Sequence, residues 1–174
     1  MRQGERGFTL LELLVVIAIS AIIALGAGMT AVQVIKGSHE SNALMTVTNQ
    51  VNNVGYWVSR DILSAQSVNA SDDTGTGDTE FVIMNWNDWE TGEMHDIRYI
   101  WLASTDSLQM LKRKQVICDK NDVEISNKVT LVADNIYSAN LTQEDTRWKL
   151  IVEARSRGRS LNREYFISQR QEQQ

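Results

Sequence analysis

Glu12 is the residue whose chemistry most needs explaining, because it stands near the start of an apolar run in which no residue from Leu13 to Ile35 is charged. An acidic side chain in a membrane helix costs about 2.5–3.5 kcal/mol near the bilayer centre and less toward the interface. Such a charge is tolerated when it is paired, since an unpaired buried charge is strongly destabilising. The position therefore marks Glu12 as a candidate functional residue, the alternative being a carboxylate that reaches the lipid headgroups.

The other titratable residues do not predict a catalytic centre. His39 and His95 are the only histidines and lie far apart in polar stretches of the sequence. Cys118 is the only cysteine, which excludes an internal disulfide, a CxxC redox pair and a zinc site built from several thiolates. We therefore expect that the chain is not an enzyme and binds no cofactor.

An acidic stretch, SVNASDDTGTGDTE (residues 67–80), contains hard oxygen ligands of the kind that calcium prefers. These ligands are Asp72, Asp73, Asp78 and Glu80. Their spacing does not match an EF-hand loop. A solvated acidic loop, which ends a helix and precedes a β-rich region, is therefore favoured over a calcium site.

A cationic stretch, EARSRGRSLNR (residues 153–163), surrounds a turn at Gly158 with four arginines. They are Arg155, Arg157, Arg159 and Arg163. Such a hairpin can contact DNA phosphates, anionic lipid or an acidic partner protein, or it can remain a solvated turn. The turn has no aromatic side chain on which a base could stack, and the net charge is −5. We expect no nucleic-acid partner.

The apolar run predicts a membrane-spanning helix, because it exceeds the ~20 residues that cross a bilayer core of ~30 Å. Arg2 and Arg6 precede it, which predicts a cytoplasmic N-terminus and a remainder outside the cytoplasm. The alternative is a secretory signal cut near Ala27, although the apolar part of such signals is usually only about 7–15 residues long.

Small residues recur at Ser20, Ala24 and Gly28, on one stripe of this helix. In lipid, such a stripe allows a second helix to approach closely. The alternative interpretation is that Gly and Ala are simply frequent in membrane helices.

The periodicity continues beyond the apolar run and predicts one helix over residues 8–65. Apolar residues at spacings of three and four, from Val47 to Ala65, make its second half amphipathic. β-branched and aromatic residues then predict strands. The predicted strands cover residues 81–86, 96–102, 107–114, 128–143, 147–154 and 163–169. The expected fold is α+β, with a mainly antiparallel sheet packed on the helix.

The N-terminal sequence RGFTLLELLVVIAI (residues 6–19) closely resembles the class III leader of type IV pilins and type II secretion pseudopilins. The resemblance implies that prepilin peptidase cuts after Gly7 and that the new N-terminus, Phe8, is methylated. Glu12 would then neutralise the Phe8 amine of a neighbouring subunit as the helices bundle.

The resemblance also implies the organisation of the chain and its function. The implied parts are a leader (residues 1–7), a membrane-spanning and filament-core helix (8–35), an amphipathic continuation (36–66) and a β-rich head (67–174). Such a protein is a single-pass inner-membrane protein that assembles with other pilins or pseudopilins into a filament or its tip. Its partners would be prepilin peptidase, the other subunits, a membrane assembly platform with its own ATPase, and the lipid bilayer.

Two further segments are similar to J-type or PilW-like minor pilins. They are residues 51–68, which include Arg60 and Asp61, and residues 98–114. Sequence does not choose between a pilus, type II secretion and DNA uptake. The rival interpretations are a stand-alone membrane-anchored binding or sensor protein that does not polymerise, and a secreted hydrolase with an ordinary signal.

Overall fold

The computed structural model describes residues 9–70, 79–103 and 108–168. The chain divides into two compact units, Met1–Asn42 and Ala43–Gln174. One helix, α1 (Leu10–Ser64), contributes residues to both units. Its bounds agree with the helix predicted over residues 8–65.

The first unit contains the N-terminal part of α1, and its described residues form no hydrophobic core. Every side chain from Thr9 to Asn42 is exposed, including large apolar ones such as Leu10 and Ile22. Within the described residues, α1 is the helix long and apolar enough to cross a membrane. An apolar surface of this extent requires a cover of lipid or protein.

The second unit begins where α1 acquires a buried face. The buried residues recur at spacings of three and four, which places them on one side of the helix. They are Ala43, Val47, Val51, Val54, Gly55, Val58, Asp61 and Ile62. The predicted amphipathic character of this half is therefore confirmed.

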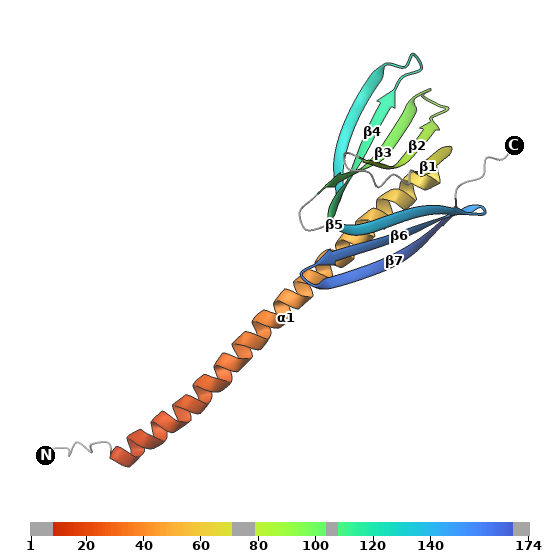
Figure 1. Ribbon diagram of the computed structural model, residues 1–174. Coiled ribbons are helices and arrows are strands. Elements are labelled where there is room, and N and C mark those ends of the chain that lie inside the picture. The colour runs from red at the N-terminus through yellow and green to blue at the C-terminus, as the bar shows by residue number, and fades with distance from the viewer. Residues whose placement is uncertain (1–8, 71–78, 104–107, 169–174) are drawn as a thin grey trace. The chain divides into compact units, whose positions relative to one another are not determined.

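A seven-stranded antiparallel sheet covers that face, with its strands ordered as they follow in the chain (Figure 1). The strands are β1 (Ser67–Ala70), β2 (Thr79–Asn87), β3 (Met94–Ala103), β4 (Gln109–Cys118), β5 (Glu124–Glu144), β6 (Arg147–Ser156) and β7 (Arg159–Ser168). All six predicted strands are present, and the α+β fold class is confirmed.

β1 corrects the prediction that the whole of residues 67–80 is a loop. Ser67 pairs with Asn85 of β2 and Ala70 with Val82, and Val68 packs against the core. β1 lies at the edge of the sheet, where polar residues such as Asn69 are tolerated because one side of the strand faces water. The Ser and Asn residues of β1 also favour loops, so the composition of the segment did not indicate a strand.

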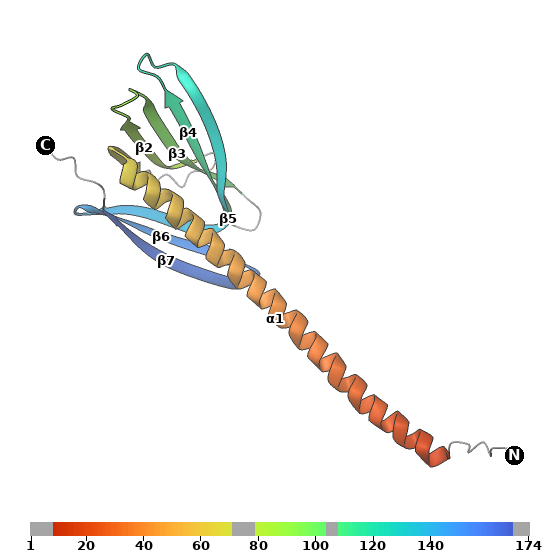
Figure 2. The ribbon, with the colours of Figure 1, turned by 180° about the vertical axis from the view of Figure 1, so that it is seen from behind.

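β5 joins two parts of the sheet, because it pairs with β4 up to Ile136 and with β6 from Ile136 onward. The C-terminal half of α1 runs between the two parts (Figure 2). Both parts direct apolar side chains to the common core, which contains Tyr99, Leu111 and Ile136 from one part and Leu150 and Val152 from the other. The alternation predicted for β6 is confirmed, since Trp148, Leu150, Val152 and Ala154 are all buried.

At Gly55 the sheet packs directly against α1. A Cβ built on Gly55 would overlap the ring of Tyr165 on β7. The hydroxyl of Tyr165 donates a hydrogen bond of 3.1 Å to the carbonyl of Val51. The aromatic ring therefore occupies the space that any larger residue at position 55 would need.

We predict that Gly55→Ala lowers the unfolding free energy of the second unit by about 1–3 kcal/mol, the usual cost of overpacking. The gain in helix propensity from Gly to Ala, about 1 kcal/mol, offsets only part of it. Denaturant titration followed by tryptophan fluorescence measures the change. Gly37→Ala is the matched control, because nothing lies within 4 Å of its added Cβ. Equal stability of Gly55→Ala and the wild type would contradict the packing described.

Candidate functional site

Glu12 lies in the first turn of α1 and forms reciprocal hydrogen bonds with Thr9. The backbone N–H and the hydroxyl of Thr9 both donate to Oε2 of Glu12, at 3.4 Å each. The N–H of Glu12 donates to Oγ1 of Thr9 at 3.3 Å. This is a capping box, which satisfies backbone donors that a helix N-terminus leaves without partners.

The capping box is a role for Glu12 that the sequence reasoning missed. Its signature is Thr or Ser followed three residues later by Glu, and TLLE at residues 9–12 fits it. The carboxylate also lies at the positive end of the helix dipole. These hydrogen bonds with Thr9 hold the Glu12 side chain at the start of the helix. Gly7 and Phe8, the predicted processing residues, lie outside the described residues.

The predicted small-residue stripe is exposed along its length, at Ser20, Ala24 and Gly28. Ala24 and Gly28 line a shallow, mainly apolar groove of about 460 Å³. A Cβ added to Gly28 would meet no atom within 4 Å. The groove therefore leaves room for another chain to approach the helix backbone at Gly28. Ser20, the third residue of the predicted stripe, does not line the groove.

Of the four calcium candidates in the acidic stretch, only Glu80 belongs to the described residues. Glu80 forms an ion pair with Arg98, at 3.0 Å from Nη1. Asp72, Asp73 and Asp78 lie outside the described residues. Among residues 9–70, 79–103 and 108–168 there is no group of three or more acidic, His or Cys side chains able to hold a metal ion.

The two histidines take unrelated positions. His39 is exposed on α1 in the first unit. His95 on β3 stacks on Trp86 at 4.9 Å between ring centroids, and its Nε2 lies 3.8 Å from Glu93. Its Nδ1 is buried without a hydrogen-bond partner within the described residues.

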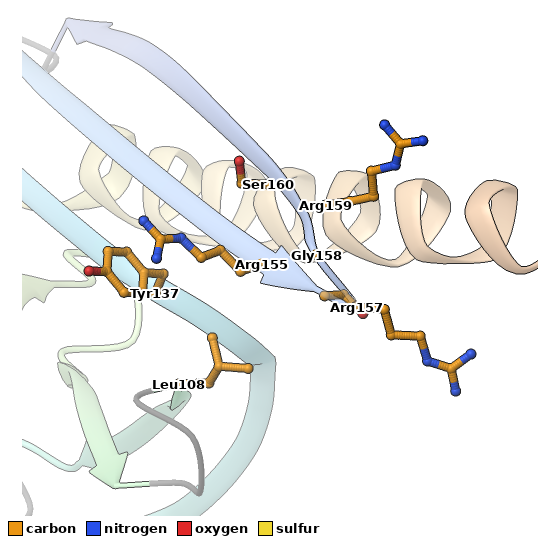
Figure 3. Close-up of a pocket in the computed structure, with 8 residues that line it drawn as sticks. Leu108, Tyr137, Arg155, Arg157, Gly158, Arg159 and Ser160 are labelled. Atoms are coloured by element: carbon orange, nitrogen blue, oxygen red, sulfur yellow. The ribbon is translucent and has the colours of Figure 1, made fainter.

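The four predicted arginines flank a two-residue turn between β6 and β7. Arg157 and Gly158 both have positive φ, 47° and 78°, as a tight hairpin turn requires. Arg155 stacks on Tyr137, with its guanidinium carbon 3.2 Å from the ring centroid. Arg163 points to another part of the unit, where it donates to Asn52 of α1. Figure 3 shows the open pocket around this turn.

The most buried polar cluster joins α1 to β3 and β4, and the sequence did not reveal it. Asp61 and Arg113 are 2% and 3% exposed. Nε of Arg113 donates to Oδ2 of Asp61 at 2.6 Å, and Nη2 donates to Oδ1 at 3.1 Å. The hydroxyl of Tyr99 donates to the same Oδ2 at 2.6 Å. The carboxylate is thus satisfied by a two-pronged guanidinium contact and a phenol.

Aromatic and polar neighbours complete the environment of Arg113. Its Nη1 donates to Oε1 of Gln115 at 2.9 Å, and its guanidinium carbon lies 5.2 Å from the Trp57 ring centroid. Burial acts to lower the pKa of Arg113, but the hydrogen bonds and charge of Asp61 outweigh it and raise that pKa. Burial and Asp61 also raise the pKa of Tyr99. Both groups therefore keep their protons, and the cluster carries one positive and one negative charge.

We predict that Arg113→Met destabilises the second unit by about 3–5 kcal/mol, because it removes the buried guanidinium that pairs with Asp61 and leaves the carboxylate with the longer contact to the half-exposed Arg60, whose Nε lies 3.9 Å from Oδ1. Tyr99→Phe should cost about 1–3 kcal/mol, through the loss of one hydrogen bond to the carboxylate. The double variant Asp61→Leu with Arg113→Met should lose clearly less than the sum of the single losses. Denaturant titrations of the wild type, Arg113→Met, Asp61→Leu, Tyr99→Phe and the double variant measure these differences, and a double-variant loss equal to the sum of the Asp61→Leu and Arg113→Met losses would contradict the coupling.

Comparison with known proteins identifies one segment. Residues 2–28 match the family described as the prokaryotic N-terminal methylation motif. No curated protein and no solved structure matches the chain. The matched segment contains the predicted processing residues, the capping box of Thr9 and Glu12, and most of the exposed apolar run. The chain therefore carries the prepilin-type N-terminal methylation motif that marks type IV pilins and pseudopilins.

Proposed function

We propose that this chain is a minor pilin-like structural subunit that is cut after Gly7, methylated on Phe8 and assembled with other subunits into a filament or its tip. One observation carries the proposal. The methylation motif over residues 2–28 runs directly into a helix whose side chains are all exposed from Thr9 to Asn42. In this proposal the chain performs no chemistry of its own.

The exposed apolar helix requires a different cover before and after assembly. Before assembly the lipid bilayer covers it, with the N-terminus in the cytoplasm and the head outside. After assembly the helices of neighbouring subunits replace the lipid. Lipid tails are as apolar as these side chains, so close packing must favour the exchange. The groove at Ala24 and Gly28 supports such packing, because it allows another backbone to approach.

Glu12 neutralises an N-terminal amine in the assembled state. Its carboxylate already accepts from the Thr9 N–H, and cleavage after Gly7 would create a cationic amine on the adjacent residue. A charge pair removes the penalty of two unpaired charges in an apolar bundle. The capping box supports this role because it fixes the carboxylate in the first turn of α1, close in sequence to the new N-terminus.

The minor-pilin assignment within this proposal is supported by two segments of the head. Asp61 belongs to residues 51–68 and Arg113 and Tyr99 belong to residues 98–114, the segments that are similar to J-type or PilW-like minor pilins. The hydrogen bonds among these three residues give those segments a common structural role. The partners are prepilin peptidase, other pilins and a membrane assembly platform. A pilus, a secretion pseudopilus and a DNA-uptake pseudopilus all fit.

The N-terminal peptide tests the proposal against its rivals. The full chain is expressed in membranes with and without a prepilin peptidase, and the mass of its N-terminal peptide is measured. The proposal predicts a peptide that starts at N-methylated Phe8 only when the peptidase is present. Retention of Met1 would favour the stand-alone membrane anchor, and a start just after Ala27 would favour a secreted protein.

We predict that Glu12→Val leaves membrane insertion and cleavage intact but strongly reduces co-isolation with other pilins, because the amine then lacks a counter-charge. Two matched variants separate charge from helix capping. Glu12→Gln retains the hydrogen bonds of a capping box but removes the charge, so it should fail like Glu12→Val. Thr9→Ala weakens the cap and retains the charge, so it should still co-isolate. Normal co-isolation of Glu12→Gln would show that the charge is not what assembly requires.

A further inference from the structure

The turn between β6 and β7 forms a basic pocket of about 630 Å³. Its lining residues are Leu108, Tyr137, Arg155, Ser156, Arg157, Gly158, Arg159 and Ser160. In Figure 3 Arg155 lies beside Tyr137, with Leu108 on the same side of the turn, whereas the side chains of Arg157 and Arg159 extend from the turn in other directions. The turn thus offers guanidinium groups next to apolar surface, which suits an acidic ligand that also carries apolar surface.

Two arginines of the basic pocket differ in their pairing within the head. Arg155 pairs with Glu153 at 2.7 Å, and this hydrogen bond raises the pKa of Arg155. No carboxylate of the described residues lies within ion-pair distance of Arg157, which is exposed. Like charges held together around one turn repel each other, and a bound acidic group relieves that repulsion.

The opposite charge gathers on two neighbouring loops, residues 88–93 between β2 and β3 and residues 119–124 between β4 and β5. We call these loops the acidic tip. Met94 pairs with Cys118 beside them, and a Cβ on Gly92 would lie 3.9 Å from Cβ of Lys120. The tip carries six carboxylates against the single cation Lys120 within these described loops. They are Asp88, Glu90, Glu93, Asp119, Asp122 and Glu124.

The acidic tip is ionised and also carries apolar surface. Hydrogen bonds from the backbone N–H of Glu90 and of Val123 lower the pKa values of Asp88 and Asp119. Trp89 is 84% exposed and Val123 is 59% exposed. Tryptophan is enriched among the residues that carry binding energy at protein interfaces, and Leu108 and Tyr137 of the basic pocket offer apolar surface to a partner.

The acidic tip does not reach the basic pocket of its own chain. Glu124, at the tip, and Tyr137, in the pocket, lie on the same strand β5. At ~3.3 Å per residue the strand separates them by about 40 Å. Figures 1 and 2 show the β4–β5 loop and the β6–β7 turn at well-separated places in the unit.

We propose that the acidic tip of one copy of this chain docks into the basic pocket at Arg155, Arg157 and Arg159 of the next copy. The two surfaces differ, so the contact is head-to-tail, and it links one copy of the chain to another within the assembled filament or its tip. The inference rests on the proposed function, because it specifies a contact between assembled subunits. It adds a partner surface on the head that is independent of the N-terminal helix.

The native thiol of Cys118 allows a direct test, because it lies at the acidic tip opposite Glu124. One tagged copy carries Cys118→Ser and Ser160→Cys, and a differently tagged copy retains Cys118 alone. Both full-length chains are co-expressed in membranes with a prepilin peptidase, the other pilins and the membrane assembly platform, and the membranes are treated with a bis-maleimide. Partial burial and the carboxylates Asp122 and Glu124 raise the pKa of Cys118, so the reaction is run at mildly alkaline pH to increase the thiolate. Only a tip-to-pocket contact between copies joins the two tags.

Charge variants make the test specific. Arg157→Glu in the first copy should lower the cross-linked product about tenfold, because carboxylates then face carboxylates. Arg147→Glu is the matched control, since it makes the same charge change at the other end of β6 and should leave the product unchanged. Glu90→Lys with Glu124→Lys in the second copy should restore cross-linking to the Arg157→Glu copy.

Absence of the product between the cysteine-bearing copies overturns the contact, and so does a product that Arg157→Glu leaves unchanged. The N-terminal peptide is measured in the same membranes. A peptide starting at methylated Phe8 without cross-linking overturns this contact and leaves the proposed function standing. A chain that retains Met1 overturns the proposed function itself.

Discussion

The ion pair between Asp61 and Arg113 fixes the sheet to the helix, and the rest of the head depends on it. Both charges are almost fully buried, so neither tolerates the loss of the other. Their geometry allows one register: the carboxylate meets two nitrogens of Arg113 and the hydroxyl of Tyr99. Apolar contacts such as those of Val54 and Val58 would allow the helix to slide or rotate slightly under the sheet. The ion pair selects a single arrangement among them.

The same helix has to satisfy two environments. From Ala43 onward its buried face meets a sheet, whereas from Thr9 to Asn42 every side chain is exposed. Folding of the head therefore leaves the apolar surface of the first part of α1 exposed. That surface still needs lipid or other helices around it. The methylation motif over residues 2–28 lies in the part without its own core. Processing and assembly would thus act on the segment that the head leaves uncovered, while the head contributes shape and surface charge.

Local sequence patterns predicted most of the helix and strands. They did not predict interactions between residues that lie far apart in the sequence. The valine spacing from Val47 to Val58 and the alternation from Trp148 to Ala154 depend on neighbours in the chain, so the sequence contains them directly. Asp61 and Arg113 are 52 positions apart, and nothing in either local sequence indicates the other. β1 escaped because edge strands tolerate the Ser and Asn residues that also favour loops. The capping box of Thr9 and Glu12 has a local signature that the sequence contains. The apolar residues around Glu12 instead favoured an interpretation based on its charge.

The central claim is that this chain leaves the membrane as part of a filament. Mechanical shearing of cells without detergent tests it most directly, because it releases filaments and leaves membrane anchors behind. Quantitative mass spectrometry would compare the sheared and membrane fractions of cells that express the full chain with a complete set of pilins. The account predicts that the chain enters the sheared fraction together with those pilins. A chain that stays wholly in the membrane fraction while the other pilins are sheared off would contradict it.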